Sequence, residues 1–293
     1  FALVINFHRN ERASAIAAFS GGKRIVGYSQ PGFKRFFDKV MPNCAMADTP
    51  PELVKHQVLC HLDVLKEAVG VKTIDDRGLE MMLPPEEEAK ASALWQQEFA
   101  PDAKVLAVHS GASWRTKRWL DSYFAAGADR FIHEGYDIAF MGGPTDVPLV
   151  EQCCAQMEEK ASSHVHVFTG KVSLTVLAGL LRRCSLFLTT DSGPMHVGVA
   201  MNVPSVTMLG ASPVPTFYPY DGKDVLIKTP EPCHPCGIHE CPRKGQDNMA
   251  CMKNIPVDTV MKYAEELLAA HDGAPAYEWP PHPGDYKCRV IEL

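Results

Sequence analysis

Residues 189–196 read Thr-Thr-Asp-Ser-Gly-Pro-Met-His and lie between two apolar runs, at residues 186–188 and 203–209. Each run has the length of a buried strand. Asp191 and Ser192 belong to the residue types that favour a helix N-cap, and Pro194 suits the first turn of a helix. The stretch therefore predicts a strand, a tight turn, a short helix and a second buried strand.

This turn has the layout of an anion site. A strand that leads into a capped helix presents free backbone N–H groups at its carboxyl end, where phosphates bind in α/β folds. Pro194 has no N–H, so the expected donors are Ser192, Gly193, Met195 and His196. The alternative interpretation is an ordinary capped turn without a ligand. The His196 side chain would either meet a phosphate or pack on the helix face.

A second segment of the same character lies upstream at residues 104–119, with the sequence KVLAVHSGASWRTKRW. It predicts a strand that ends in a loop of Gly, Ser and Thr with three cations, ahead of a helix. Lys117 supplies a positive charge, and Ser113 and Thr116 supply hydroxyl donors, which is the combination that phosphoryl oxygens need. The loop is not a Walker A motif, because the second glycine before the lysine is missing. The alternative for Lys117 is a solvated surface side chain.

Apolar runs and amphipathic segments alternate from residue 104 onwards. The expected strands lie at 104–109, 137–141, 164–167, 185–190 and 204–209. The expected helices lie at 121–134, 147–159, 173–182, 195–201 and 256–271. This alternation predicts a doubly wound parallel sheet. Earlier in the chain we expect strands at 2–7, 23–28 and near 81–87, and helices at 12–19, 51–70 and 86–99.

The composition is that of an ordinary globular protein and limits the classes of function that the chain can have. At 293 residues the chain is long enough for two domains with filled cores. A net charge of −6 argues against nucleic acid as the main partner. No apolar run is long enough to span a bilayer, and we expect no signal peptide. The ten cysteines are scattered along the sequence, which indicates a reducing cytoplasm.

Two of these stretches together resemble glycosyltransferase family 9, the bacterial ADP-heptose:lipopolysaccharide heptosyltransferases. They are GASWRTKRW at residues 111–119 and DSGPMHVGVAMNVPSVTMLGASPVP at residues 191–215. A third stretch, residues 232–252, is similar to the cysteine-bearing segment of the heptosyltransferase II branch. The resemblance is specific between residues 104 and 260 and weak before residue 100.

The resemblance implies an α/β fold of the GT-B class, with two Rossmann-like doubly wound domains facing across a cleft. Residues 1–100 would form an incomplete N-terminal, acceptor-side domain, and residues 101–271 the C-terminal domain that binds the nucleotide-sugar donor. The last helix would cross back to the first domain, and residues 272–293 would form an irregular tail. The family's general base lies in an opening loop that no residue here matches, because Phe1 falls on a later strand. We therefore expect a truncated sequence rather than a degenerate member.

The resemblance also implies roles for single residues. Asp191 would lie near the sugar and the pyrophosphate, and Lys117 would stabilise the leaving nucleoside diphosphate, so these two are the expected catalytic residues. Asp146 would hold the ribose hydroxyls or act as the N-cap of 147–159, and these two roles can coexist. Val172 would pack on the adenine. The expected donor-binding set is Ser113, Thr116, Lys117, Asp146, Val172, Asp191, Ser192, Gly193, Met195 and His196.

The implied reaction is inverting transfer of a heptose from ADP-heptose to a lipid-linked sugar of the lipopolysaccharide inner core. A carboxylate base would deprotonate the acceptor hydroxyl. No cofactor is expected, since the sequence has no D-x-D triplet of the metal-binding kind. The protein would be cytoplasmic, with peripheral association at the inner face of the inner membrane. The alternatives are another nucleotide-sugar transferase or epimerase of the same architecture, and a non-catalytic sugar-nucleotide-binding protein.

Four cysteines follow the pattern C-x2-C-x4-C-x9-C at Cys233, Cys236, Cys241 and Cys251. Such a set could bind a structural zinc ion, with His234 or His239 as a substitute ligand. Reduced thiols and disulfides formed on purification are the alternatives. In none of the three cases do we expect a catalytic role for the cluster.

Overall fold

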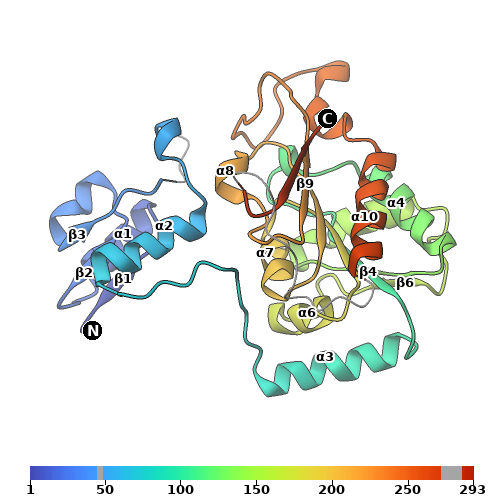
Figure 1. The fold of residues 1–293 in the computed structure, drawn as a ribbon, viewed down its shortest axis with the longest axis horizontal. Helices are drawn as coiled ribbons and strands as arrows, with labels where there is room; N and C mark the ends of the chain where they lie inside the picture. The colour runs from blue at the N-terminus through green and yellow to red at the C-terminus, as the bar shows by residue number, and fades with distance from the viewer. Residues whose placement is uncertain (45–48, 272–285) are drawn as a thin grey trace. The chain divides into compact units, whose positions relative to one another are not determined.

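The computed structural model describes residues 1–44, 49–271 and 286–293. The chain divides into two compact units, whose elements are labelled in Figure 1. Unit 1 comprises Phe1–Arg77 with Pro215–Phe217, and unit 2 comprises Gly78–Val214 with Tyr218–Leu293.

Unit 1 contains a three-stranded parallel sheet of order β1-β2-β3. Its strands are β1 (Val4–Asn6), β2 (Ile25–Gly27) and β3 (Lys39–Val40). Its helical segments are α1 (Glu11–Ala18), η1 (Pro31–Phe36), η2 (Pro51–Leu53), α2 (Gln57–Asp63) and the π-helix η3 (Val64–Val69). Ile25 packs with Ala17 of α1, whereas Val26 packs with Cys60 of α2 and Val64 of η3. Successive side chains of a strand point to opposite faces, so β2 is covered on both.

Unit 2 is built on a seven-stranded sheet of order β10-β9-β8-β7-β4-β5-β6, in which neighbouring strands are parallel. The strands are β4 (Val105–Val108), β5 (Asp137–Phe140), β6 (Val165–Val167), β7 (Leu186–Thr190), β8 (Ser205–Met208), β9 (Val225–Lys228) and β10 (Arg289–Glu292). The predicted doubly wound parallel sheet is confirmed, with all five of its expected strands.

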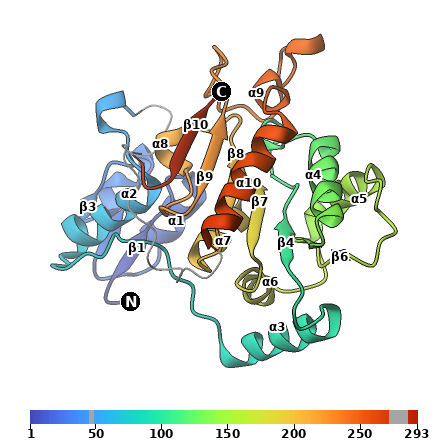
Figure 2. The same ribbon diagram turned by 45° about the vertical axis from the view of Figure 1, so that its right-hand side comes forward.

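Helices cover both faces of this sheet (Figure 2). One face carries α4 (Asp121–His133), α5 (Val147–Ala155) and α10 (Val257–His271). The other carries α3 (Pro85–Glu98), α6 (Leu174–Leu181) and α7 (Gly193–Ala200). The shorter helices are η4 (Arg115–Lys117), η5 (Pro144–Asp146), α8 (Val214–Phe217), η6 (Gly245–Asp247) and α9 (Ala250–Lys253).

The central strand β4 shows why its sequence is apolar throughout. Leu106 and Val108 pack against the helices of the first face, and Val105 and Ala107 against those of the second. A parallel strand buried on both faces needs apolar side chains at every position. The short uninterrupted run before the first site loop is therefore the signature of a central strand.

Several expectations differ from the structure. The chain divides after Arg77 and not near residue 100, because helix α3 packs on α6 of unit 2. The two helices approach so closely that a Cβ on Gly179 would lie 2.6 Å from Ala91 Cβ. Helix α10 packs on α4, β7 and β8 within unit 2, and its crossing back to the first domain stays a prediction. No strand forms at the described residues 81–87, because α3 begins there. The expected irregular tail is wrong at β10, which pairs with β9, while residues 272–285 lie outside the described residues.

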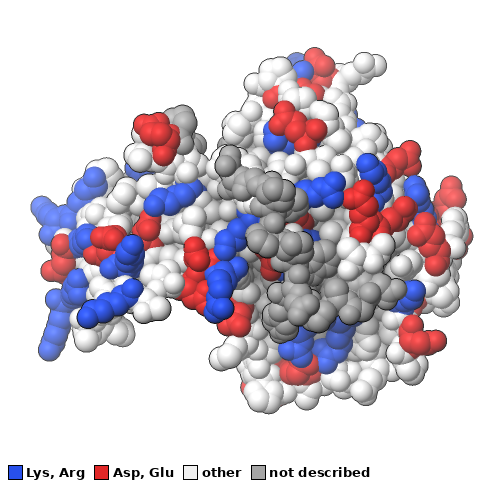
Figure 3. Space-filling model, viewed as in Figure 1, with Lys and Arg blue, Asp and Glu red and all other residues white. Residues whose placement is uncertain are grey.

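The two units differ in charge. Residues 1–77 contain eleven Lys and Arg and eight Asp and Glu, for a net charge of +3, and the other residues contain eighteen and twenty-seven, for −9. Figure 3 shows basic and acidic side chains together over both units, with basic side chains prominent along the outer side of unit 1. In the described part of the chain, no helix combines the length and the apolar character that crossing a membrane requires.

Candidate functional site

The loops that carry the expected site residues meet at the carboxyl edge of the unit 2 sheet. β4 lies between β5 and β7, and the chain passes from β4 to β5 and β6 before it returns to the other side of β4 as β7. Ligands of open α/β sheets bind outside the carboxyl ends of the strands where the order reverses in this way. The carboxyl ends of β4 and β7 are therefore the place to look for a ligand site.

Lys117 and Asp191, the two expected catalytic residues, form an ion pair at this point. Lys117 Nζ lies 2.8 Å from Asp191 Oδ2, and the aspartate is only 4% exposed. The ammonium also lies over the Trp114 ring, 4.7 Å from its centroid, and Trp114 in turn stacks on His239 with the ring centroids 4.2 Å apart. A cation over an aromatic face is attracted by the ring's electron density. Lys117 is thus held in place and is not a freely solvated surface lysine.

Asp146 faces a buried histidine that the sequence interpretation did not single out. Asp146 Oδ2 accepts a hydrogen bond from Gly143 N at 2.8 Å and lies 3.4 Å from His109 Nε2. Burial raises the pKa of Asp146, but the bonds from His109 and Gly143 and the charge of Arg118 outweigh burial, so the pKa lies below its usual value. The carboxylate is therefore ionised near neutral pH and can accept hydrogen bonds from hydroxyl groups.

The other ring nitrogen of His109 connects the Asp146 loop to the start of α7. His109 Nδ1 lies 3.1 Å from Ser192 Oγ, and the histidine is 1% exposed. A Cβ on Gly111 would lie 2.3 Å from Asp146 Oδ1 and 2.9 Å from His109 Nε2. The absent side chain of Gly111 therefore makes room for the contact between the aspartate and the histidine.

The start of α7 has the form of an anion site. Ser192 is its N-cap residue, but the hydroxyl bonds to His109 instead of to a helix N–H. Gly193 is exposed, whereas the side chain of Met195 is buried, so Met195 contributes its backbone only. Burial lowers the pKa of His196, the charge of Lys117 lowers it further, and the charge of Asp191 raises it. The net effect is a lowered pKa, so the imidazole is neutral. The turn thus leaves its backbone N–H groups for a ligand.

The two expected hydroxyl donors of the Lys117 loop, Thr116 and Ser113, differ in burial. The side chain of Thr116 is buried, and its hydroxyl donates to the carbonyl of Ile238, while its backbone N–H donates to the carbonyl of His239 at 3.3 Å. Thr116 therefore fixes the cysteine-bearing segment to the Lys117 loop. Ser113 is exposed at the entrance of the same loop.

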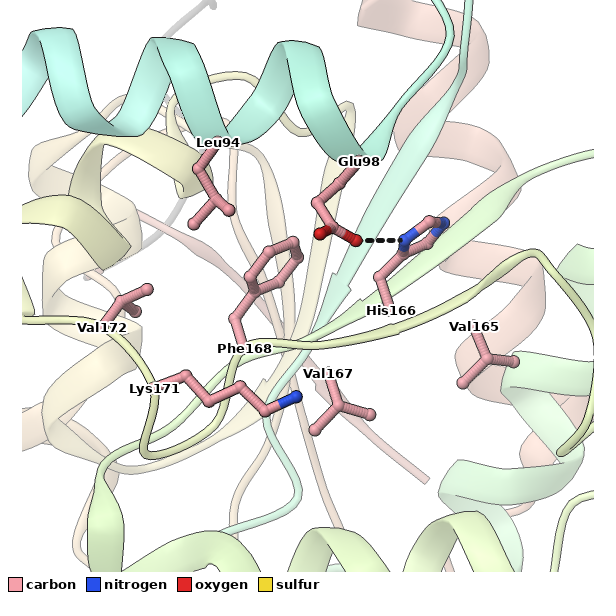
Figure 4. A pocket seen from close by; sticks show the side chains of 8 residues that line it. All are labelled: Leu94, Glu98, Val165, His166, Val167, Phe168, Lys171 and Val172. Atoms are coloured by element: carbon pink, nitrogen blue, oxygen red, sulfur yellow. Dashed lines mark hydrogen bonds and ion pairs between the residues drawn. The ribbon is translucent and has the colours of Figure 1, made fainter.

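Val172 lines a cavity of about 430 Å³ beside the edge strand β6 (Figure 4). Its other lining residues are Leu94, Glu98, Val165, His166, Val167, Phe168 and Lys171. Glu98 of α3 and His166 of β6 are paired at one side of it, with Glu98 Oε2 3.3 Å from His166 Nδ1. The cavity is apolar on the side of Phe168 and Val172, which suits a flat ring.

The cysteine-bearing segment does not fit a metal. All ten cysteines are free thiols, and among the described residues no three His, Cys, Asp or Glu side chains are placed to hold an ion. Burial raises the pKa of Cys251 to about 11, and the nearby thiols of Cys236, Cys233 and Cys241 add to the rise. Met249 N donates to Cys241 Sγ at 3.3 Å. The geometry supports the reduced-thiol interpretation of this segment.

We expect elemental analysis of freshly purified, reduced protein to find far less than one metal ion per chain, because the four thiols are not arranged as ligands. Thiol titration should in turn label Cys233 first, since it is the exposed member of the four. A result close to one ion per chain, lowered by Cys236→Ser but not by the matched Cys154→Ser, would restore the zinc hypothesis.

A doubly wound sheet with a fixed cation and an open helix N-terminus at its switch point is an α/β architecture whose switch point suits a phosphate-bearing ligand. Residues 1–246 match the sequence profile of glycosyltransferase family 9 (heptosyltransferase), and the chain belongs to this family. It is 27% identical over 216 residues to lipooligosaccharide heptosyltransferase 2 of Campylobacter jejuni serotype O:2, which is 73% of this chain and 64% of that protein. The chain thus spans less than two thirds of the length of this relative.

Other relatives and solved structures agree with this assignment. Lipopolysaccharide heptosyltransferase 2 of Escherichia coli K12 is 31% identical over 103 residues, 35% of this chain and 29% of that protein. The family 9 glycosyltransferase structure from Veillonella parvula superposes with a TM-score of 0.73 at 27% identity, over 92% of this chain and 74% of that one. The structure of E. coli heptosyltransferase II superposes with a TM-score of 0.68 at 19% identity, over 92% of this chain and 77% of that one, which shows the shared fold. The GT-B fold class is confirmed.

Proposed function

We propose that this chain transfers a heptose from ADP-heptose to a sugar of the lipopolysaccharide inner core, with inversion at the anomeric carbon. The observation that carries the proposal is the Lys117 ammonium, held 2.8 Å from Asp191 beside the start of α7. The names of the relatives support the same activity. A solved E. coli heptosyltransferase, WaaC, contains an ADP-heptose analogue, and it shares the fold of this chain with a TM-score of 0.58.

The donor would lie along the carboxyl edge of the unit 2 sheet. Its diphosphate would meet Lys117 and the N–H groups at the start of α7, where the helix dipole favours negative charge. Its ribose hydroxyls would donate to the ionised Asp146 carboxylate, and its adenine would pack on Val172. Support for this pose comes from the sheet order, because β4, β5, β6 and β7 bring all these loops to one edge.

The chemistry that follows is displacement of ADP from the anomeric carbon by an acceptor hydroxyl. As the glycosidic bond to the diphosphate breaks, negative charge builds up on the leaving ADP. Lys117 and the first turn of α7 would stabilise that charge without a metal ion. Asp191 would orient Lys117 and accept a hydrogen bond from the sugar. The base that removes the acceptor proton is not assigned to a residue of this chain. The acceptor is lipid-linked, so the protein would work at the inner face of the inner membrane.

The test is a transfer assay with ADP-heptose as the donor and heptose-deficient inner-core lipopolysaccharide as the acceptor. We expect release of ADP that depends on the acceptor and persists in EDTA, and no release of nucleotide from UDP- or GDP-sugars. Turnover of another nucleotide sugar in place of ADP-heptose would refute the donor assignment. Tight binding of ADP-heptose without product from any core acceptor would identify a binding protein instead of a transferase.

A further inference from the structure

His109 is the buried group that joins the two halves of the proposed donor site. It follows β4 directly, and its ring lies between Ser192 of the α7 turn and Asp146 of the β5 loop. A neutral imidazole has one N–H and one lone pair, and an ionised carboxylate can only accept. We therefore assign the hydrogen to Nε2, facing Asp146, and the lone pair to Nδ1, which accepts from the Ser192 hydroxyl.

This arrangement does not yet suit a phosphate. The Ser192 hydrogen is used in the bond to His109 Nδ1, so the hydroxyl can offer a ligand at the start of α7 only its lone pairs. Phosphoryl oxygens also carry lone pairs and need donors. One additional proton on His109 removes the mismatch, because Nδ1–H can then donate to Ser192 Oγ and free the hydroxyl hydrogen.

We propose that His109 takes up a proton when a nucleoside diphosphate binds and thereby turns the Ser192 hydroxyl into a donor to the diphosphate. The inference rests on the proposed function, since it requires the donor diphosphate to lie at the start of α7. The proton comes from solvent and adds to Nδ1. Ser192 O–H then donates to a phosphoryl oxygen, and the Nε2–H bond to Asp146 is kept. His109 is in this sense a positioning residue that acts through Ser192.

The charges around His109 make the uptake depend on the anion. Asp146, in contact with Nε2, favours the imidazolium. Arg118 lowers the pKa of Asp146, and Asp191, which directly precedes Ser192, is paired with Lys117 of η4. Burial lowers the pKa of His196 of α7. In the unliganded site the charges of Lys117 and Arg118 are therefore matched by those of Asp191 and Asp146, and no surplus negative charge faces the ring. A bound diphosphate adds negative charge beside Ser192, and the balance moves to the protonated form.

The experiment is calorimetry of ADP binding near neutral pH in buffers with different enthalpies of ionisation, whose slope gives the protons exchanged. We expect the wild-type protein to take up as much as about one proton per ADP more than the His109→Gln variant, because an imidazole has a single site to gain. Glutamine keeps one donor for Asp146 and one acceptor for Ser192 but cannot be protonated in this range. Proton exchange by ADP itself is common to both proteins and cancels in the comparison.

The matched control is His164→Gln. His164 also pairs with a carboxylate, Asp137, at 2.7 Å, but it lies before β6 at the amino edge of the sheet. This variant should keep the wild-type proton uptake. The ADP affinity of the wild type should fall as pH rises, and that of His109→Gln should fall less.

Equal proton uptake in the wild type and in His109→Gln, with ADP bound by both, would overturn the role of His109 and leave the proposed function intact. Failure of the wild type to bind ADP would overturn both. Should His109→Gln not fold, NMR of the wild-type imidazoles decides the matter, because ADP must then protonate one buried histidine. An unchanged histidine spectrum with ADP bound would contradict the proposal.

Discussion

Replacing Lys117 with alanine should weaken ADP binding by about ten- to a hundredfold, since a hydrogen bond to a charged group contributes about 1.5–3 kcal/mol. The variant also leaves Asp191, which is 4% exposed, without its counter-charge beside the diphosphate. Transfer should fall at least as far as binding, because the leaving group gains charge as the bond breaks. Calorimetry with ADP and the transfer rate on the same sample measure the two effects.

The double variant Lys117→Ala with Asp191→Asn separates the two causes of that loss. If Lys117 contacts the diphosphate directly, the double variant remains weak, since no cation has been restored. Recovery of ADP binding in the double variant would mean that Lys117 serves only to neutralise Asp191. Lys104→Ala is the matched control, because Lys104 precedes β4 at the opposite edge of the same sheet. It should leave ADP binding and transfer unchanged.

The second large effect is expected from Gly111→Ala. The added Cβ would lie 2.3 Å from Asp146 Oδ1 and 2.9 Å from His109 Nε2, so the aspartate must move. Its bond from Gly143 N, 2.8 Å long, and its contact with His109 would be lost together. We expect a loss of about 1–3 kcal/mol in the free energy of unfolding, as for other overpacked sites, and a loss of ADP affinity about tenfold or greater.

Gly127→Ala is the control for Gly111→Ala. Its Cβ would meet only Met261 Sδ at 3.6 Å, an ordinary contact, and alanine favours the α4 helix that contains it. Thermal melting and ADP titration of both variants measure how stability and ADP affinity respond to a methyl group added in the site and to one added in the core. Wild-type ADP affinity in Gly111→Ala would show that the Asp146 carboxylate does not contribute to donor binding.

The sheet of unit 2 could be predicted because its strands are buried on both faces. β4 is apolar throughout and β7 at its first three positions, β8 alternates polar and apolar residues, and turn-forming residues follow all three strands, which leaves few other interpretations. Lys117 and Asp191 were expected at the site because each belongs to a loop that follows such a strand. Their pairing depends on β4 and β7 being neighbours, which is a property of the sheet order.

The site contacts that could not be predicted join residues far apart in the sequence. His109 reads locally as a histidine at the end of a core strand, and its partners Asp146 and Ser192 lie 37 and 83 residues away. Its place directly after β4, two residues before a glycine, is the signal that could have singled it out. β10 was missed because its short apolar run, at Val290 and Ile291, follows a proline-rich stretch.

The division of the chain after Arg77 has a preparative consequence. Between η3 and α3 the residues form no helix or strand, and Lys72 and Arg77 are exposed there. Exposed irregular segments are where proteases cut folded proteins first. Trypsin would therefore separate the chain into a basic N-terminal fragment and an acidic C-terminal one, with formal net charges of +3 and −9 after cleavage at Arg77. Because the two fragments carry net charges of opposite sign, ion exchange under denaturing conditions would separate residues 1–77 from residues 78–293 in one step.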